Sequence, residues 1–302
     1  MAARDRRRFP PPGMLVDVGG HRLHLLRSGT GGPTVVLESG LGCTYLDWTR
    51  VQQEASKFVE VCSYDRAGRG YSEPGPRPRD AGRIADELHA LLARAGIRPP
   101  YVLVGHSLGG LCARVFADRY RADVCGIVLV DAPPEDQGTR WPARSFAVRA
   151  RLEIRWRLFQ LNPLLARLGI LRILRKPWAS RRGMPRELRQ RERALGLQSR
   201  AYDWIFDEGS AIAATEAEAG RSEALGDLPL AVVTAAHTPD LSDQTYASWL
   251  EMQRGLCRLS SNSTHLVART SGHVVALEEP ELVVEAIRWV IAQATSPRGY
   301  PR

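Results

Sequence analysis

Short apolar runs alternate with helix-like stretches along most of this chain. The apolar runs read TVVLESG (34–40), VEVCSYD (59–65), YVLVGH (101–106) and CGIVLVD (125–131). The helix-like stretches between them cover residues 46–58, 84–95 and 108–120. Strands buried on both faces show such continuous apolar runs, and helices form the crossovers that parallel strands require. The alternation predicts an α/β domain built on a mostly parallel, doubly wound sheet of about eight strands.

A hairpin precedes this alternation, and one long insertion interrupts it. Two β-like runs, 14–18 and 21–26, are separated by Gly19-Gly20, which indicates a tight turn. After Pro133-Pro134 no comparable strand appears until LPLAVVTAA (228–236), followed by a helix-like stretch (243–257), THLVART (264–270) and a last amphipathic helix (280–292). We therefore expect a flexible leader at 1–13, an α/β core at 14–134 and 223–302, and an insertion at 135–222.

The insertion is expected to be largely helical. Its helix-like stretches cover residues 162–174, 187–197 and 202–218, whereas residues 148–158 fit a helix and a strand equally well. Its aromatic side chains either line a substrate pocket or simply pack the insertion on the core. We expect the insertion to cover the site as a helical cap.

The net charge of +9 is concentrated in one segment. Between Arg140 and Arg200 there are seventeen basic and three acidic residues, so this segment carries +14 and the rest of the chain −5. No nucleic-acid-binding motif accompanies these arginines, and we expect no nucleic-acid partner. Peripheral contact with an anionic lipid surface is an alternative, but a merely solvated basic face is the favoured interpretation.

The composition is that of an ordinary globular protein. Of the 302 residues, 44% are hydrophobic and 25% charged, which excludes wholesale disorder and fibrous repeats. No apolar run reaches the roughly 18 residues of a transmembrane helix, and the first residues lack the apolar stretch of a secretion signal. We expect a cytoplasmic protein whose five cysteines are reduced thiols. No phosphate-binding loop or metal-ligand spacing is visible, so we expect neither cofactor nor metal.

The run YVLVGHSLGGLCARVFADRY carries the clearest catalytic motif. It places Gly105-His106-Ser107-Leu108-Gly109 between a buried strand and a helix, the context in which G-x-S-x-G forms a nucleophile elbow. The turn is so tight that residues flanking the serine must be nearly free of side chains, as Gly105, Gly109 and Gly110 are. The motif predicts that Ser107 is a nucleophile, against the alternative of a serine that only caps a helix.

With these residues the chain resembles the α/β-hydrolase superfamily, specifically its esterase- and lipase-like serine-hydrolase branch with a helical cap. The resemblance covers residues from about 14 to 294 and rests on LESGLG (37–42), YDRAGRGYS (64–72), VGHSLGG (104–110), VLVDA (128–132) and TSGHVVALEEPELV (270–283). It implies the α/β-hydrolase fold and a triad in the chain order serine, acid, histidine. The YDRAGRGYS segment is a family marker, in which Asp65 and Arg66 are expected to brace the loop beneath the active site.

The resemblance identifies one of seven histidines as the base. In the family, the loop after the last strand carries the catalytic histidine, and here that loop holds His273. A serine hydroxyl needs such a base within hydrogen-bond reach, oriented in turn by a third group. The other six histidines lie in the opening hairpin, in a helix, at the variable elbow position or next to strands.

The orienting acid is less clearly marked. Family members usually carry it just after the strand that here reads LPLAVVTAA, but His237 and Thr238 occupy those positions. Asp240 and Asp243 follow a few residues later, whereas Asp131 ends the strand CGIVLVD, the position used by a minority of cap-bearing relatives. We favour Asp131, because the carboxyl end of that strand lies on the same rim as Ser107, and keep Asp240 as the alternative.

Acyl transfer also needs donors for the oxyanion. The N–H of Leu108, directly after the nucleophile, is expected to be one donor. The family's His-Gly-x turn corresponds here to a turn in which Ser39 replaces the usual histidine and Leu41 supplies the second N–H. Epoxide hydrolases and dehalogenases of this fold attack with aspartate, which Ser107 replaces here.

We therefore expect a cofactor-free serine hydrolase that cleaves a small carboxylic ester. The alternatives keep the triad but change the acceptor or bond, as in an acyltransferase, perhydrolase, amidase or lactonase. A catalytically silent ligand-binding or regulatory protein of the same fold is an alternative of another class.

Overall fold

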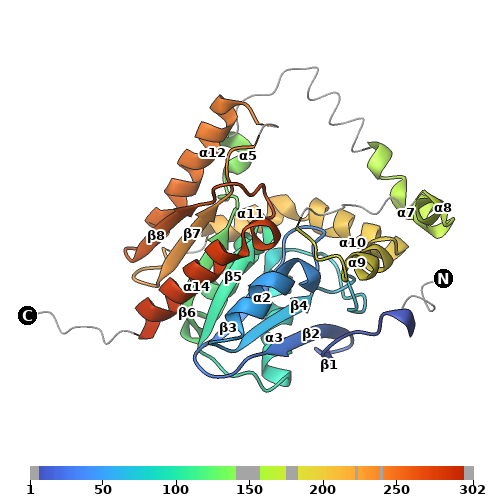
Figure 1. Cartoon of the computed structure of the whole chain (residues 1–302), viewed down its shortest axis with the longest axis horizontal. Helices are drawn as coiled ribbons and strands as arrows, with labels where there is room; N and C mark the ends of the chain where they lie inside the picture. The colour runs from blue at the N-terminus through green and yellow to red at the C-terminus, as the bar shows by residue number, and fades with distance from the viewer. Residues whose placement is uncertain (1–6, 141–156, 175–182, 222–223, 239–240, 296–302) are drawn as a thin grey trace, which may run out of the picture.

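A computed structural model of the chain describes residues 7–140, 157–174, 183–221, 224–238 and 241–295 (Figure 1). The described residues form one eight-stranded sheet in the order β1-β2-β4-β3-β5-β6-β7-β8. Its strands are β1 (Met14–Asp17), β2 (Arg22–Ser28), β3 (Thr34–Glu38), β4 (Val61–Asp65), β5 (Tyr101–His106), β6 (Val124–Val130), β7 (Leu230–Thr234) and β8 (Ser263–Val267). The pairs β1–β2 and β2–β4 are antiparallel and the remaining pairs parallel. This topology confirms the expected α/β-hydrolase fold.

Helices cover both faces of the sheet. Those of the core are α2 (Thr49–Ala55), preceded by the 3₁₀ turn η1 (Tyr45–Trp48), α3 (Ala81–Arg94), α4 (Leu108–Arg119), α12 (Asp243–Leu256), α13 (Val275–Glu278) and α14 (Pro280–Thr295). Two further 3₁₀ turns are η2 (Arg121–Asp123) and η3 (Cys257–Leu259). All residues of β3, β4, β5 and β7 are buried, as their continuous apolar sequences predicted.

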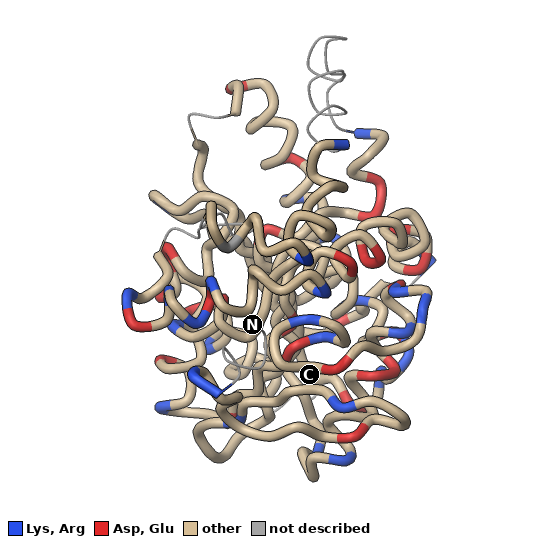
Figure 2. The backbone as a smooth tube through the Cα atoms, turned by 90° about the vertical axis from the view of Figure 1, so that its right-hand side faces the viewer, with Lys and Arg blue, Asp and Glu red and all other residues tan. Residues whose placement is uncertain are grey.

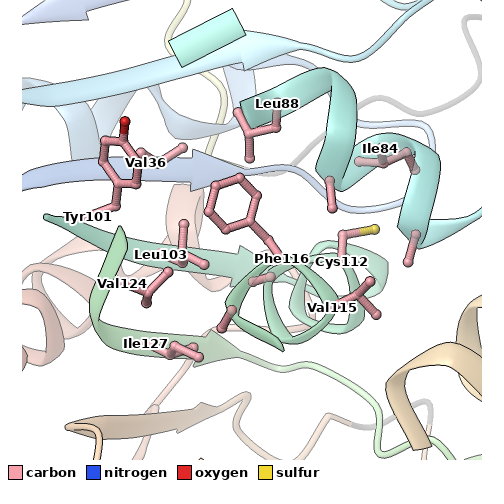
Figure 3. Close-up of a cluster of buried hydrophobic side chains, with 14 of the residues drawn as sticks. Val36, Ile84, Leu88, Tyr101, Leu103, Cys112, Val115, Phe116, Val124 and Ile127 are labelled. Atoms are coloured by element: carbon pink, nitrogen blue, oxygen red, sulfur yellow. The ribbon is translucent and has the colours of Figure 1, made fainter. Parts of the chain in front are cut away.

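Each central strand contributes to two hydrophobic clusters, because successive side chains point to opposite faces of a sheet. Along β5, Leu103 lies in the cluster formed with α3 and α4, whereas Val102 and Val104 lie in the one formed with α2 and α14. Figure 3 shows the first cluster, with Phe116 of α4 between the sheet and Leu88 of α3. This two-sided burial holds the carboxyl ends of β5 and β6 in place.

The described parts of the insertion consist of helices joined by turns and short loops, with no strand among these residues. Its helices are α5 (Gln137–Arg140), α7 (Asn162–Arg167), α8 (Ile170–Ile173), α9 (Arg189–Gly196), α10 (Ser199–Ser210) and α11 (Ile212–Arg221). The expectation of one helix over 162–174 was wrong, because Gly169, with φ 76°, separates α7 from α8. The expected helix over 202–218 is likewise divided between α10 and α11. Of the ambiguous stretch 148–158, residues 148–156 lie outside the described part.

Charged residues of both signs are interspersed along the backbone tube of the described part (Figure 2). The described cysteines form no disulfide. None of the helices that the structure describes has both the length and the apolar character needed to cross a bilayer.

A buried ion pair joins the antiparallel edge of the sheet to the rest. His24 of β2 lies 2.8 Å, Nδ1 to Oδ2, from Asp65 at the end of β4, and both side chains are fully buried. Asp65 also accepts the backbone N–H groups of Tyr45 and Tyr71. Burial alone would lower the pKa of His24, but the hydrogen bond and charge of Asp65 raise it above the ordinary value of 6.5.

This pair gives a pH-dependent contribution to stability. Because the pKa of His24 is raised on folding, its contribution to the unfolding free energy is complete below its ordinary pKa of 6.5 and is lost as pH rises through the raised value. We expect the unfolding free energy to fall less between about pH 6 and about pH 9 in His24→Gln than in the wild type. Urea titrations at both pH values measure this, and identical pH dependence in the two proteins would contradict it.

Candidate active site

The backbone at Ser107 is strained. Ser107 connects β5 to α4 with φ 53° and ψ −125°, a conformation that L-residues rarely adopt. Among the described residues, only Ser107 and Asp131 are non-glycine residues with positive φ. Such strain costs on the order of 1–3 kcal/mol and persists only where the surroundings enforce it, most often at functional sites. Both residues were candidates from the sequence.

The glycines around Ser107 are required by close backbone approach. A Cβ atom on Gly105 would lie 2.4 Å from the carbonyl oxygen of Gly109, and one on Gly109 would lie 2.4 Å from the carbonyl oxygen of Glu38. A Cβ on Gly40 would lie 2.9 Å from Nδ1 of His106 and 3.2 Å from Cβ of Ser107. The elbow and the turn after β3 are therefore in contact, with no room for side chains between them.

Asp131 and His273 are hydrogen-bonded to each other. His273 Nδ1 lies 2.6 Å from Asp131 Oδ2, although the two residues are 142 positions apart in the chain. The His273 side chain is 55% exposed and that of Asp131 only 5%, so the imidazole can reach a substrate while the carboxylate cannot. The pair is thus a buried acid behind an accessible base.

Further donors stabilise the carboxylate of Asp131. Its Oδ1 accepts the backbone N–H of Ala235 at 3.0 Å and the indole N–H of Trp249 at 2.8 Å. Burial acts to raise the pKa of Asp131, but the hydrogen bond and charge of His273, together with these two donors, hold that pKa below its usual value. Asp131 is therefore ionised when it faces the imidazole. Trp249, on α12, carries no sequence signal for this contact and was not expected.

The described Asp243 and the histidines other than His273 have different partners. Asp243 is exposed and lies 3.3 Å from His237, and Asp240 lies outside the described residues. Four of the remaining histidines pair with side chains other than those of Asp131 and His273: His21 with Glu87, His24 with Asp65, His89 with Asp123 and His265 with Thr234. His106 contacts the carbonyl of His273.

His273 lies beside the elbow. His106, the residue before Ser107, hydrogen-bonds through Nε2 to the carbonyl oxygen of His273 at 2.8 Å. The centroids of the two imidazole rings are 4.7 Å apart. Among the described residues, no hydrogen bond joins the Ser107 hydroxyl to the His273 ring. Catalytic hydrogen bonds are often long without substrate and tighten in the complex, so the arrangement is compatible with proton transfer between these two groups.

Two backbone N–H groups are candidates for an oxyanion site. Leu108 is the first residue of α4, where helical N–H groups have no acceptor within the helix. Leu41 lies in the turn after β3, and its N–H has no acceptor among the described residues. Ser39, which replaces the family's histidine, accepts the indole N–H of Trp48 at 3.1 Å and donates to the carbonyl of Thr44. The Ser39 hydroxyl thus links the start of the turn to Thr44 and Trp48, which follow it in the chain.

A buried charge cluster lies beneath this turn. Arg66 is paired with Glu38 at 2.6 Å and with Glu208 of α10 at 2.8 Å, and all three side chains are at most 2% exposed. Burial acts to raise the pKa of Glu208, but the charge of Arg66 holds it below its usual value. The YDRAGRGYS motif led us to expect that Arg66 braces this loop. No local pattern in the sequence marked Glu208 as its partner.

A cavity of about 250 Å³ adjoins the acid–base pair. Its lining is mostly uncharged and comprises Asp131, Gln137, Ala235, Ala236, Thr238, Leu241, Tyr246, Trp249 and His273. Because both members of the pair line it, a small organic group bound there would lie against the imidazole.

The glycine packing at the elbow is testable by stability. Gly105→Ala is expected to lower the unfolding free energy by about 1–3 kcal/mol, the usual cost of overpacking, because its Cβ would meet backbone atoms that cannot move aside. Gly138→Ala is the control, since a Cβ there meets nothing within 4 Å. Equal stability of the two variants in chemical denaturation would show that the elbow has spare room.

Comparison with known proteins relates the chain to hydrolases. Residues 35–286 match the family model described as "Alpha/beta hydrolase family". The chain is 28% identical over 320 residues to the probable transporter efuK of Hormonema carpetanum, covering 94% of this chain and 43% of that protein. The chain spans less than half the length of the first curated relatives it matches.

Solved structures of similar fold include two hydrolases. An esterase from Thermogutta terrifontis superposes with a TM-score of 0.63 at 24% identity, covering 94% of this chain and 99% of that one. The epoxide hydrolase CorEH superposes with a TM-score of 0.66 at 22% identity, covering 91% and 97%. The fold, the elbow after β5 and the extent of the family match together establish that this chain belongs to the α/β-hydrolase family.

Proposed function

We propose that this chain is a serine hydrolase that cleaves small carboxylic esters. The observation that carries the proposal is the 2.6 Å hydrogen bond between Asp131 and an exposed His273, located beside a strained Ser107. A buried acid, an accessible imidazole and a serine on a sharp turn are the three parts that nucleophilic acyl transfer requires. The similar fold of a solved esterase is compatible with this activity.

The proposed reaction assigns one role to each group. Ser107 Oγ attacks the ester carbonyl while His273 accepts its proton, and the N–H groups of Leu41 and Leu108 stabilise the oxyanion. Asp131 keeps the imidazole in the tautomer with Nδ1–H and stabilises the cation that forms. His273 then protonates the departing alkoxide, and a water molecule, deprotonated by the same imidazole, hydrolyses the acyl-enzyme and regenerates the Ser107 hydroxyl.

The nucleophile distinguishes this chemistry from that of the epoxide hydrolase of similar fold. Epoxide hydrolases of this superfamily attack with aspartate, and a hydroxyl in its place forms an ether that water does not readily cleave. An acyl-serine ester, by contrast, is cleaved by water under general-base catalysis. Ser107 therefore favours an ester over an epoxide.

We also propose that residues 135–222 form a cap over this site. Helix α10 of this segment supports the proposal, because its Glu208 forms an ion pair with Arg66 on the loop after β4. The cavity beside Asp131 and His273 would then bind part of the substrate, and its volume of about 250 Å³ favours a short acyl or alcohol group.

Ser107→Ala is expected to abolish turnover of a short p-nitrophenyl ester, because the variant lacks the hydroxyl that attacks the ester carbonyl in the proposed reaction. A fluorophosphonate probe should label the wild type at Ser107 and leave the variant unlabelled, as read by mass spectrometry. Undiminished ester turnover in Ser107→Ala would reject the proposed nucleophile.

Asp131→Asn is expected to lower kcat by about 10⁴-fold, as loss of the orienting acid does in other triads, because the amide no longer selects the correct imidazole tautomer. Asp240→Asn and Asp243→Asn are the matched controls and should keep near-wild-type kcat. A large loss in Asp240→Asn with activity retained in Asp131→Asn would transfer the role to Asp240.

A further inference from the structure

The carbonyl groups of the turn after β3 are held by two buried arginines. Arg66 donates to the carbonyls of Ser39 and Gly40, the latter at 2.9 Å. Arg69 donates to the carbonyls of Gly42 and, at 3.5 Å, Cys43. The turn that carries Leu41 is therefore fixed by guanidinium groups on the loop after β4, and not only by its own backbone.

Every N–H group of the Arg66 guanidinium has an acceptor. Besides the two carbonyls, Nη1 donates to Glu38 at 2.6 Å, and Nε and Nη2 donate to the two carboxylate oxygens of Glu208 at 2.9 and 2.8 Å. Five donors in one rigid plane meet five acceptors. The bidentate contact with Glu208 fixes the rotation of that plane, because the planar carboxylate matches the planar guanidinium edge.

The orientation of Arg66 is transmitted to the Leu41 N–H through one peptide bond. The carbonyl of Gly40 and the N–H of Leu41 belong to the same peptide unit, which is planar and trans, so the two groups point in opposite directions. Holding the Gly40 carbonyl toward Arg66 therefore directs the Leu41 N–H away from it. That N–H has no acceptor among the described residues, as a donor reserved for a ligand would require.

Helix α10 is anchored to the same loop at several points. Arg69 donates to the carbonyl of Ala201 at 2.7 Å, and Arg200 donates to the carbonyl of Gly70 at 2.7 Å. The indole ring of Trp204 packs on Gly68 so closely that a Cβ on that glycine would lie 2.1 Å from a ring atom. These contacts hold α10 against the loop after β4 and so fix the position of Glu208 relative to Arg66.

We propose that Glu208, on a helix of the insertion, is a positioning residue that sets the direction of the Leu41 N–H through Arg66 and the Gly40–Leu41 peptide. This inference rests on the proposed function, in which that N–H binds the oxyanion. It goes further by making one helix of the insertion part of the catalytic geometry, in addition to any role in covering the site.

Glu208→Gln is the decisive variant, because it keeps the size of the side chain but replaces one acceptor oxygen and the charge. We expect kcat per active site to fall about tenfold, less than the 10²–10³-fold loss caused by deleting an oxyanion donor, with KM nearly unchanged. Active sites are counted by fluorophosphonate titration, so a smaller folded fraction does not affect the result. Affinity for a trifluoromethyl ketone, which forms an oxyanion on Ser107, should fall by the same factor as kcat.

Glu218→Gln is the matched control. Glu218 lies on α11 and contacts the N–H of Gly82 at 2.7 Å and Arg119 at 3.8 Å, and within the described part of the chain none of its contacts reaches the turn after β3. Its variant should keep wild-type kcat and ketone affinity. Glu208→Asp, which retains the charge and both oxygens, should recover part of the kcat lost in Glu208→Gln, and it replaces that variant if Glu208→Gln does not fold.

The outcomes separate this inference from the proposed function. If the wild type is labelled at Ser107 and hydrolyses the ester, but Glu208→Gln keeps wild-type kcat per active site, the positioning role is wrong and the proposed function stands. Equal losses in Glu208→Gln and Glu218→Gln would also overturn it, because they would indicate a general effect of loosening the insertion. A wild type without labelling or turnover would reject the proposed function itself.

Discussion

The backbone turn at Ser107 is the constraint on which the rest of the site depends. Its left-handed conformation brings the start of α4 against the end of β3, so closely that Gly105 and Gly109 have backbone atoms where side chains would be. The strain is tolerated because β5 is buried on both faces and cannot shift to relieve it. The same packing brings the start of α4, where Leu108 lies, against the turn after β3, beside the half-buried Ser107.

The sheet determines which charged groups meet at this place. Parallel strands end on the same edge, so Asp131 after β6 and the elbow after β5 are neighbours by topology. His273 comes to Asp131 from the loop after β8, and Trp249 of α12 supplies a further donor to the carboxylate. The buried Arg66 beneath the turn pairs with two carboxylates, Glu38 at the end of β3 and Glu208 of α10, and so ties α10 to the edge of the sheet where Ser107 and Asp131 lie.

Much of the fold was predictable because its signals are local. The apolar runs at 34–40 and 101–106 gave correct strands, and the elbow motif was recognisable from its flanking strand and helix. Prediction was poorer in the insertion, where Gly169 ends α7 at a position that helical periodicity alone does not reveal. At the site, the sequence left Asp131 and Asp240 as alternatives; the structure pairs Asp131 with His273, and the catalytic roles of both remain proposals. The Glu208–Arg66 contact had no sequence signal, since an acidic residue within a helix is ordinary.

The sequence by itself determined the order of strands and helices, the tight turn at Ser107 and the glycines around it, because each of these depends on residues only a few positions apart. Only the tertiary structure decided which carboxylate faces His273 and which one orients Arg66. Both contacts join residues 142 positions apart, and such distant partners are selected by the packing of the sheet and of α10, not by any pattern along the chain. The pairing of Asp131 with His273 and of Glu208 with Arg66 therefore comes from the fold, whereas Ser107, the proposed nucleophile, is already marked by its local motif in the sequence.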